Sequence, residues 1–273
     1  MMAAPRSTRS FPAARRALPA IALAGLAAML AGCATKVGPI TVDDSVQATG
    51  QSSRVRYLVL HYTGLPADSS LRVLSQQEVS AHYLVTDTTP PHVYQLVPES
   101  RSAWHTGVSY WYGQISLNAT SIGIEIVNSG NEHGDWQPYT QAQIDTVIAL
   151  VRDVAQRHGI EPRNIVGHSD IAPQRKIDPG PSFPWHELAQ AGLGRWYDEA
   201  GAAAQLARLQ NEPLPDVAWF QQQLQRLGYE CPQDGELTPA TRRVIAAFQM
   251  HYRPARYDGE PDAETAAIML AMP

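Results

Sequence analysis

Between residues 54 and 193, short apolar runs alternate with segments of helical periodicity. Residues 55–60 form an apolar, β-branched run that ends at His61, and residues 122–127 form a second run of this kind. Runs of this length and composition, bounded by polar residues, predict buried strands. Further strands are predicted at residues 82–85, 92–97 and 164–168.

Two segments of the same region have the spacing of amphipathic helices. Residues 139–158 repeat apolar side chains at helical intervals; Thr140 and Gln143 form a capping-box pattern at the start, and Gly159 follows the end. Residues 71–79 predict a shorter helix. Strands that alternate with helices predict a mixed α/β domain in which helices flank a central sheet.

The pattern changes after residue 193, where we place the end of this domain. Residues 194–215 are rich in Ala, Gln and Glu, and we interpret them as a linker with some helix. Residues 216–273 predict a small domain of three short helices. The first ends at Gly228, the second begins after Thr238-Pro239, and Asp262 opens the third.

Residues 1–32 have the pattern of a signal for export. Four arginines and no acidic residue accompany an apolar run over residues 17–31, which is short for a membrane-spanning helix. Leu30-Ala31-Gly32-Cys33 resembles the lipobox of bacterial lipoproteins, in which the cysteine becomes lipidated after cleavage before it. The alternative is an ordinary signal peptide with an incidental cysteine. We expect lipidation of Cys33 and a polar tether over residues 33–53.

Charge and cysteine content narrow the possible partners. Removal of the four arginines of the predicted signal takes the formal net charge from −5 to −9. An acidic protein is a poor binder of nucleic acid and is not attracted to anionic lipid, so a membrane anchor would consist of acyl chains. With Cys33 lipidated, Cys231 has no partner, which excludes a disulfide framework.

Three candidate metal ligands lie at or beyond the ends of predicted strands. His61 and His168 end two of them, and Asp178 follows in a loop rich in Pro and Gly. Open α/β sheets place their sites at such strand ends, and two histidines with one carboxylate are a common ligand set for catalytic zinc. Nine histidines and 26 acidic residues also allow chance combinations. On spacing alone, two core histidines bonded to backbone carbonyls remain an alternative.

Four segments together resemble the type 2 N-acetylmuramoyl-L-alanine amidases, over about residues 54–190. The resemblance is nearest to the lipoprotein amidases of Gram-negative outer membranes. It implies zinc-dependent hydrolysis of the amide between N-acetylmuramic acid, or its 1,6-anhydro form, and L-alanine in peptidoglycan fragments, for cell-wall turnover or recycling. The segments are Leu58-Val59-Leu60-His61, Ala103-Trp104-His105-Thr106-Gly107, Ser121-Ile122-Gly123-Ile124-Glu125 and residues 167–181, which begin Gly167-His168-Ser169-Asp170.

The resemblance implies a role for each matching residue. It makes His61, His168 and Asp178 the zinc ligands. It makes Glu125 the general base or the carboxylate that orients water, and Lys176 the cation that stabilises the developing oxyanion. These residue types suit the chemistry, because zinc acidifies water and a buried carboxyl has a raised pKa.

Three further positions belong to the same matching segments. Trp104 and His105 match a family segment that lines the substrate groove; the alternative is a core tryptophan beside a hydrogen-bonded histidine. Asp170 is expected to brace the loop that carries the second histidine ligand.

About residues 216–272 resemble the small three-helix peptidoglycan-binding domain, and the alternative is a helical appendage that only stabilises the protein. Taken together, the sequence predicts an outer-membrane lipoprotein that faces the periplasm and hydrolyses peptidoglycan or muropeptides. The competing hypothesis is a peptidoglycan-recognition lipoprotein without catalytic activity. Retention of every implied ligand, with Glu125 and Lys176, argues against that hypothesis.

Overall fold

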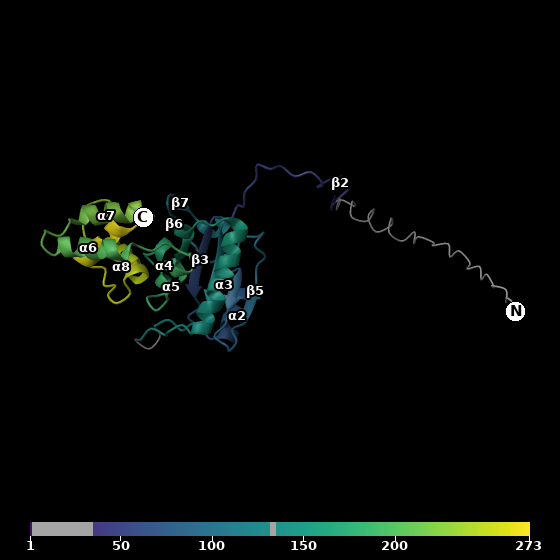
Figure 1. The fold of residues 1–273 in the computed structure, drawn as a ribbon, viewed down its shortest axis with the longest axis horizontal. Coiled ribbons are helices and arrows are strands. Elements are labelled where there is room, and N and C mark those ends of the chain that lie inside the picture. The colour runs from purple at the N-terminus through teal and green to yellow at the C-terminus, as the bar shows by residue number, and fades with distance from the viewer. Residues whose placement is uncertain (2–34, 132–134) are drawn as a thin grey trace. The chain divides into compact units, whose positions relative to one another are not determined.

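The computed structural model describes residues 1, 35–131 and 135–273 (Figure 1). Residues 2–34, which include most of the predicted signal and Cys33, lie outside this description. The chain divides into two compact units, Met1–Gln51 and Ser52–Pro273. The first unit contains a hairpin of β1 (Thr35–Val37) and β2 (Ile40–Val42). Among the described residues, no helix has the length and apolar character needed to cross a membrane.

A five-stranded sheet with the order β5-β4-β8-β3-β9 forms the centre of the second unit. Its middle strands are β3 (Tyr57–Tyr62) and β8 (Ser121–Ile126), which run parallel. The strands β4 (Tyr83–Val85) and β9 (Ile165–Gly167) extend the parallel arrangement, and β5 (Val93–Gln95) is an antiparallel edge. The predicted mixed α/β fold is confirmed, and each predicted strand overlaps one of these five.

Side chains alternate between the two faces of the central strands, as a pleated backbone requires. Leu58 and Leu60 of β3 pack with the isoleucines of β8 against α3 (Gln141–His158), which covers this face (Figure 1). The intervening residues point to the other face, and among them are His61 and Glu125, which are register partners on neighbouring strands. The hydrophobic face thereby fixes where the polar side chains of the site emerge.

The predicted long helix has the expected ends. Thr140 and Gln143 make both hydrogen bonds of a capping box, and Gly159 has the left-handed φ of 67° that ends the helix. The shorter predicted helix is α2 (Ala67–Gln76), which begins four residues earlier than expected.

Several short elements had no counterpart in the sequence pattern. A hairpin of β6 (Tyr110–Trp111) and β7 (Gln114–Ile115) precedes a 3-10 turn and β8. After β9 come α4 (His168–Ile171) and α5 (Trp185–Gln190). His168 therefore begins a one-turn helix and does not end a strand.

The three predicted C-terminal helices are α7 (Val217–Arg226), α8 (Pro239–Tyr252) and α9 (Ala263–Ala271). A fourth helix, α6 (Glu199–Leu209), lies within the residues that we interpreted as a linker, and it packs along α9. These helices share one hydrophobic cluster with the sheet. Its members from the sheet side include Val59, Val166 and Ile171, and those from the helices include Phe220, Leu224, Tyr229, Val244 and Phe248.

Candidate metal and catalytic site

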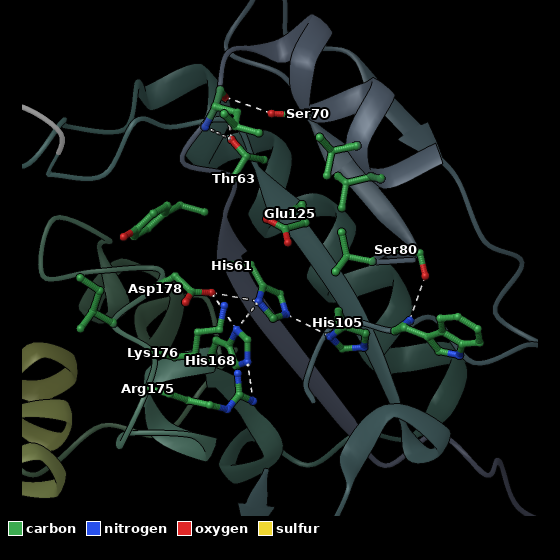
Figure 2. Close-up of a pocket in the computed structure, with 17 residues that line it drawn as sticks. His61, Thr63, Ser70, Ser80, His105, Glu125, His168, Arg175, Lys176 and Asp178 are labelled. Atoms are coloured by element: carbon green, nitrogen blue, oxygen red, sulfur yellow. Dashed lines mark hydrogen bonds and ion pairs between the residues drawn. The ribbon is translucent and has the colours of Figure 1, made fainter. Parts of the chain in front are cut away.

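A pocket of about 400 Å³ opens at the carboxyl ends of β3 and β8 (Figure 2). Open parallel sheets place ligand sites at this end of their strands. One wall comes from α2 and the loop that precedes it, and another from residues 175–178. All seven residues that the sequence assigned to chemistry or substrate line this pocket: His61, Trp104, His105, Glu125, His168, Lys176 and Asp178.

The three predicted metal ligands converge on the floor of the pocket (Figure 2). The Nδ1 atoms of His61 and His168 lie 3.0 Å apart, and each is 3.0 Å from Oδ2 of Asp178. All three side chains are buried. His61 thus forms one compact donor set with two residues that lie more than one hundred positions further along the chain.

The tautomers of the two histidine rings direct a lone pair of each Nδ1 toward the other ring and toward Oδ2 of Asp178. His168 donates its Nε2–H to the carbonyl of Thr106 at 3.1 Å, so its Nδ1 carries a lone pair. Nε2 of His61 faces Nδ1 of His105 at 3.0 Å. Burial, followed by the effect of His168, lowers the pKa of His61 to about 4, so this ring is neutral near pH 7.

A cation fits this arrangement. Oδ2 of Asp178 lies 3.0 Å from both Nδ1 atoms and supplies the third donor. Two ligand atoms bound to one tetrahedral zinc ion are about 3.3 Å apart, which is close to the observed separations. The donor set of two imidazoles and a carboxylate is one that zinc accepts, and an ion between them would offset the mutual repulsion of their lone pairs.

A chain of hydrogen bonds fixes the ring of His61 from within the sheet. Ser121 donates its hydroxyl hydrogen to the carbonyl of Leu117 at 2.8 Å. Its oxygen therefore accepts Nε2–H of His105 at 3.1 Å, and Nδ1 of His105 is left to accept Nε2–H of His61. Of the two tautomers of His61, this chain selects the one that presents Nδ1 to the site.

His105 lines the pocket, as expected, but it is buried and both of its ring nitrogens bond to protein groups, as in the alternative of a hydrogen-bonded histidine. Gly123 of β8 makes room for it, since a Cβ there would lie 2.5 Å from the ring. Trp104, by contrast, is 62% exposed beside the pocket, which excludes the alternative of a core tryptophan.

Glu125 extends from β8 next to His61, and its Oε2 is shielded from solvent without a hydrogen-bond partner (Figure 2). Burial and the nearby Asp178 raise the pKa of Glu125 well above its ordinary value, against the opposing charge of Lys176. A buried polar atom without a partner is costly, so this oxygen is suited to bind a ligand in the pocket.

Arg175 is a pocket residue that the sequence analysis did not single out. Its guanidinium donates to the backbone carbonyls of Thr106 and Val108, and it thereby fixes the loop that receives Nε2–H of His168. Its position next to Lys176 within a matching segment was the only signal in the sequence.

Asp170 lies behind the ligand loop, as expected of a bracing carboxylate. It accepts hydrogen bonds from the backbone N–H of Gly167, from the hydroxyl of Tyr229 and from Nδ1–H of His251. The last two residues belong to the C-terminal helical part, and the sequence analysis gave neither of them a role in the site.

Two family models match the chain. The model described as N-acetylmuramoyl-L-alanine amidase matches residues 51–181, and that of a peptidoglycan binding domain matches residues 213–269. Among curated proteins, the N-acetylmuramoyl-L-alanine amidase AmiD of Escherichia coli (strain K12) is 45% identical over 271 residues, which cover 92% of this chain and 95% of that protein. The 1,6-anhydro-N-acetylmuramyl-L-alanine amidase AmpD of Enterobacter cloacae is 46% identical over 93 residues, which cover 34% of this chain and 47% of that protein.

Solved structures show the same likeness. E. coli AmiD in complex with the substrate anhydro-N-acetylmuramic acid-L-Ala-D-gamma-Glu-L-Lys is 44% identical and aligns with a TM-score of 0.76 over 85% of this chain and 94% of that chain. AmpDh3 from Pseudomonas aeruginosa in complex with anhydromuramic pentapeptide is 39% identical and aligns with a TM-score of 0.79 over 85% of this chain and 96% of that chain.

Proposed function

The chain belongs to the N-acetylmuramoyl-L-alanine amidase family and is an amidase of peptidoglycan, and on this premise we propose that it is a zinc enzyme that cleaves muropeptides. The observation that carries the proposal is the convergence of His61, His168 and Asp178, whose three donor atoms meet 3.0 Å from one another. Because the chain is an amidase, the competing hypothesis of a recognition protein without catalytic activity no longer applies.

In the proposed reaction, water adds to the carbonyl carbon of the amide between the muramic acid and L-alanine, and the carbon–nitrogen bond then breaks. The products are a free muramic carboxylate and a peptide with a free amino group. His61, His168 and Asp178 would hold zinc, which when bound supplies Lewis-acid activation of the carbonyl and of water.

Glu125 is proposed to move the proton. It takes one from the attacking water and delivers it to the leaving nitrogen of L-alanine. A carboxyl with a raised pKa can both accept a proton and release it near neutral pH, and Glu125 lines the pocket in which the reaction would take place. Geometry carries this assignment, because Glu125 is the register partner of His61.

Lys176 is proposed to stabilise the negative charge that develops on the carbonyl oxygen. It lines the pocket two residues before Asp178, and its charge is close enough to lower the pKa of both Glu125 and His61. A cation placed where charge develops stabilises the transition state more than the ground state.

The substrates bound in the two related structures support muropeptides with a 1,6-anhydro end as substrates here. Mass spectrometry of products from defined muropeptides, with anhydro or ordinary muramic acid, tests this. We expect release of a peptide that begins with L-alanine, loss of release in chelator, and recovery with zinc. Cleavage that persists in a chain shown to be free of metal would contradict the zinc assignment.

A peptidoglycan substrate places the enzyme in the periplasm or cell wall, and we further propose that it is an outer-membrane lipoprotein anchored through Cys33. The support for the anchor is the sequence Leu30-Ala31-Gly32-Cys33. By analogy with bacterial lipoproteins, Ala34 in place of Asp after the cysteine favours the outer membrane. Cys33→Ser is expected to abolish incorporation of labelled palmitate and to leave an uncleaved precursor or a soluble product. A substituted protein that still fractionates with outer membranes would contradict the anchor.

The C-terminal helical part is proposed to bind the wall, with support from the match to the peptidoglycan binding domain over residues 213–269. The test uses the full chain carrying Glu125→Ala, so that it binds without cleaving. With excess soluble muropeptide in the pocket, this protein is expected to co-sediment with insoluble murein still. Complete release by muropeptide would show that the pocket alone retains it.

A further inference from the structure

Asp170 carries a buried carboxylate that receives hydrogen bonds from two parts of the molecule. Its side chain is 1% exposed. Gly167 donates its backbone N–H to Oδ2 at 2.7 Å, and His251 donates Nδ1–H to the same oxygen at 2.8 Å. Tyr229 donates its hydroxyl hydrogen to Oδ1 at 2.7 Å. Both oxygens are therefore satisfied, and two of the three donors come from the C-terminal helical part: Tyr229 follows α7, and His251 lies in α8.

Packing holds these two donors in place. The ring of His251 lies between Trp185 and Tyr252, with centroid distances of 3.9 and 4.1 Å and interplanar angles of 14° and 19°. Tyr229 packs edge-on against Trp111 at 5.0 Å. His251 comes from α8, which lies beside α4 and α5 (Figure 1). Side chains with so little freedom hold the carboxylate in one position.

On the other side, Asp170 determines the geometry of α4. It is the third residue of this one-turn helix, whose first residue is His168, and it satisfies the N–H of Gly167 directly before the helix. Gly167 is also packed closely, because a Cβ there would lie 2.7 Å from Cδ of Pro179.

The same turn also holds the third ligand. The backbone N–H of Ser169 donates to the carbonyl of Asp178 at 2.8 Å. A displacement of α4 would therefore move His168 and Asp178 together, and both would move relative to His61 on the central strand.

We propose that the C-terminal helices form part of the support of the metal centre, in addition to any role in binding the wall. Tyr229 and His251 hold Asp170, Asp170 holds α4, and α4 places two of the three ligands. Asp170, Tyr229 and His251 are positioning residues in this proposal, which rests on the proposed zinc function.

A contact that only joins two parts of the protein would also be buried and hydrogen-bonded. The free energy of unfolding alone therefore does not test the proposal. Zinc affinity does, because support of metal ligands by outer groups is worth about 10- to 100-fold in metal affinity or activity. A contact that only joins the two parts changes the unfolding temperature but not the zinc dissociation constant of the folded protein.

The matched pair of variants is Tyr229→Phe and Tyr257→Phe, both made in the full chain. Each removes one phenol hydroxyl from the same interface. That of Tyr229 binds Asp170, whereas that of Tyr257 accepts the indole N–H of Trp136 at 2.7 Å. We expect Tyr229→Phe to weaken zinc binding by about tenfold in competition with a chelating dye, and Tyr257→Phe to change it less than about threefold.

A second pair tests the other donor. His251→Asn keeps an N–H near the position of Nδ1, whereas His251→Ala removes both the donor and the stacked ring. We expect the zinc affinity to follow the order parent, Asn, Ala. In saturating zinc, kcat of Tyr229→Phe is expected to return close to that of the parent with KM unchanged, which Glu125→Ala would not do.

The outcomes separate this inference from the proposed function. A parent chain that binds no zinc overturns the proposed function, and this inference falls with it. A parent that binds zinc, with equal affinity in Tyr229→Phe and His251→Asn, overturns this inference alone. Because Tyr229→Phe preserves the ring and its packing, the decision does not depend on whether His251→Ala folds.

Discussion

His61 and His168 present the same ring nitrogen to the site but depend on different parts of the molecule. His61 ends a central strand, and its ring is held through His105 and Ser121 within the sheet. His168 begins a one-turn helix whose Asp170 bonds to the C-terminal helices. A ligand on a central strand takes its rigidity from the sheet, whereas one on an isolated turn requires support from elsewhere.

The largest effect is expected from substitution of the two histidine ligands themselves. His61→Ala and His168→Ala each delete a ligand, so both proteins are expected to lose stoichiometric zinc and, with it, amidase activity. Metal analysis of the purified proteins and hydrolysis of a defined muropeptide measure this. Stoichiometric zinc in either variant would show that the histidine concerned is not a ligand.

Lys176→Ala tests the proposed stabilisation of the oxyanion, because it leaves the hydrogen bonds that hold His61 and His168 in place. We expect the variant to keep its zinc and to lose about 100- to 1,000-fold in kcat, as removal of a group that stabilises an oxyanion does. Lys176→Arg serves as control, because it keeps the charge. A variant that retains the full kcat would remove Lys176 from the proposed mechanism.

Glu125→Ala is expected to keep its zinc and to lose about 100-fold or more in turnover, because a general base contributes this much. Glu125 is the register partner of His61, so loss of zinc from this variant would assign it to the ligand set instead. Turnover at the parent's rate would show that another group moves the proton.

His105→Ala interrupts the support of His61 alone, and we expect zinc affinity to fall by about tenfold. Ser121→Ala, one hydrogen bond further from the metal, is expected to cost less. Combined with Tyr229→Phe, the effect of His105→Ala on the free energy of zinc binding should be additive within about 0.5 kcal/mol, because independent sites add. Strong coupling between the two substitutions would mean that the supports are not separate.

Local patterns predicted most of the sheet, and they made His61, His168 and Asp178 candidate metal ligands. Buried strands such as β3 and β8 are continuous apolar runs, which are visible in any short window. The family resemblance then named His61, His168 and Asp178, and the structure brings them together. The ends of the elements were less well predicted, since α2 begins four residues before the expected start and His168 opens a helix.

The supports of the site could not be predicted in this way. Asp170 lies 59 and 81 positions from Tyr229 and His251, and no periodicity connects residues so far apart. His105 lines the pocket as expected, but a short motif does not show that both of its ring nitrogens bond within the protein. Contacts of this kind depend on how complete elements pack, which the sequence of one element does not contain.

The hydrophobic cluster that joins the sheet to α7 and α8 has a consequence for unfolding. Two parts with separate cores melt as separate transitions, whereas parts that share a core lose it together. In a calorimeter, the unit Ser52–Pro273 should therefore give a single heat-absorption peak, with a calorimetric enthalpy close to the van't Hoff enthalpy. Heat would then disrupt the metal centre and the C-terminal helices at one temperature.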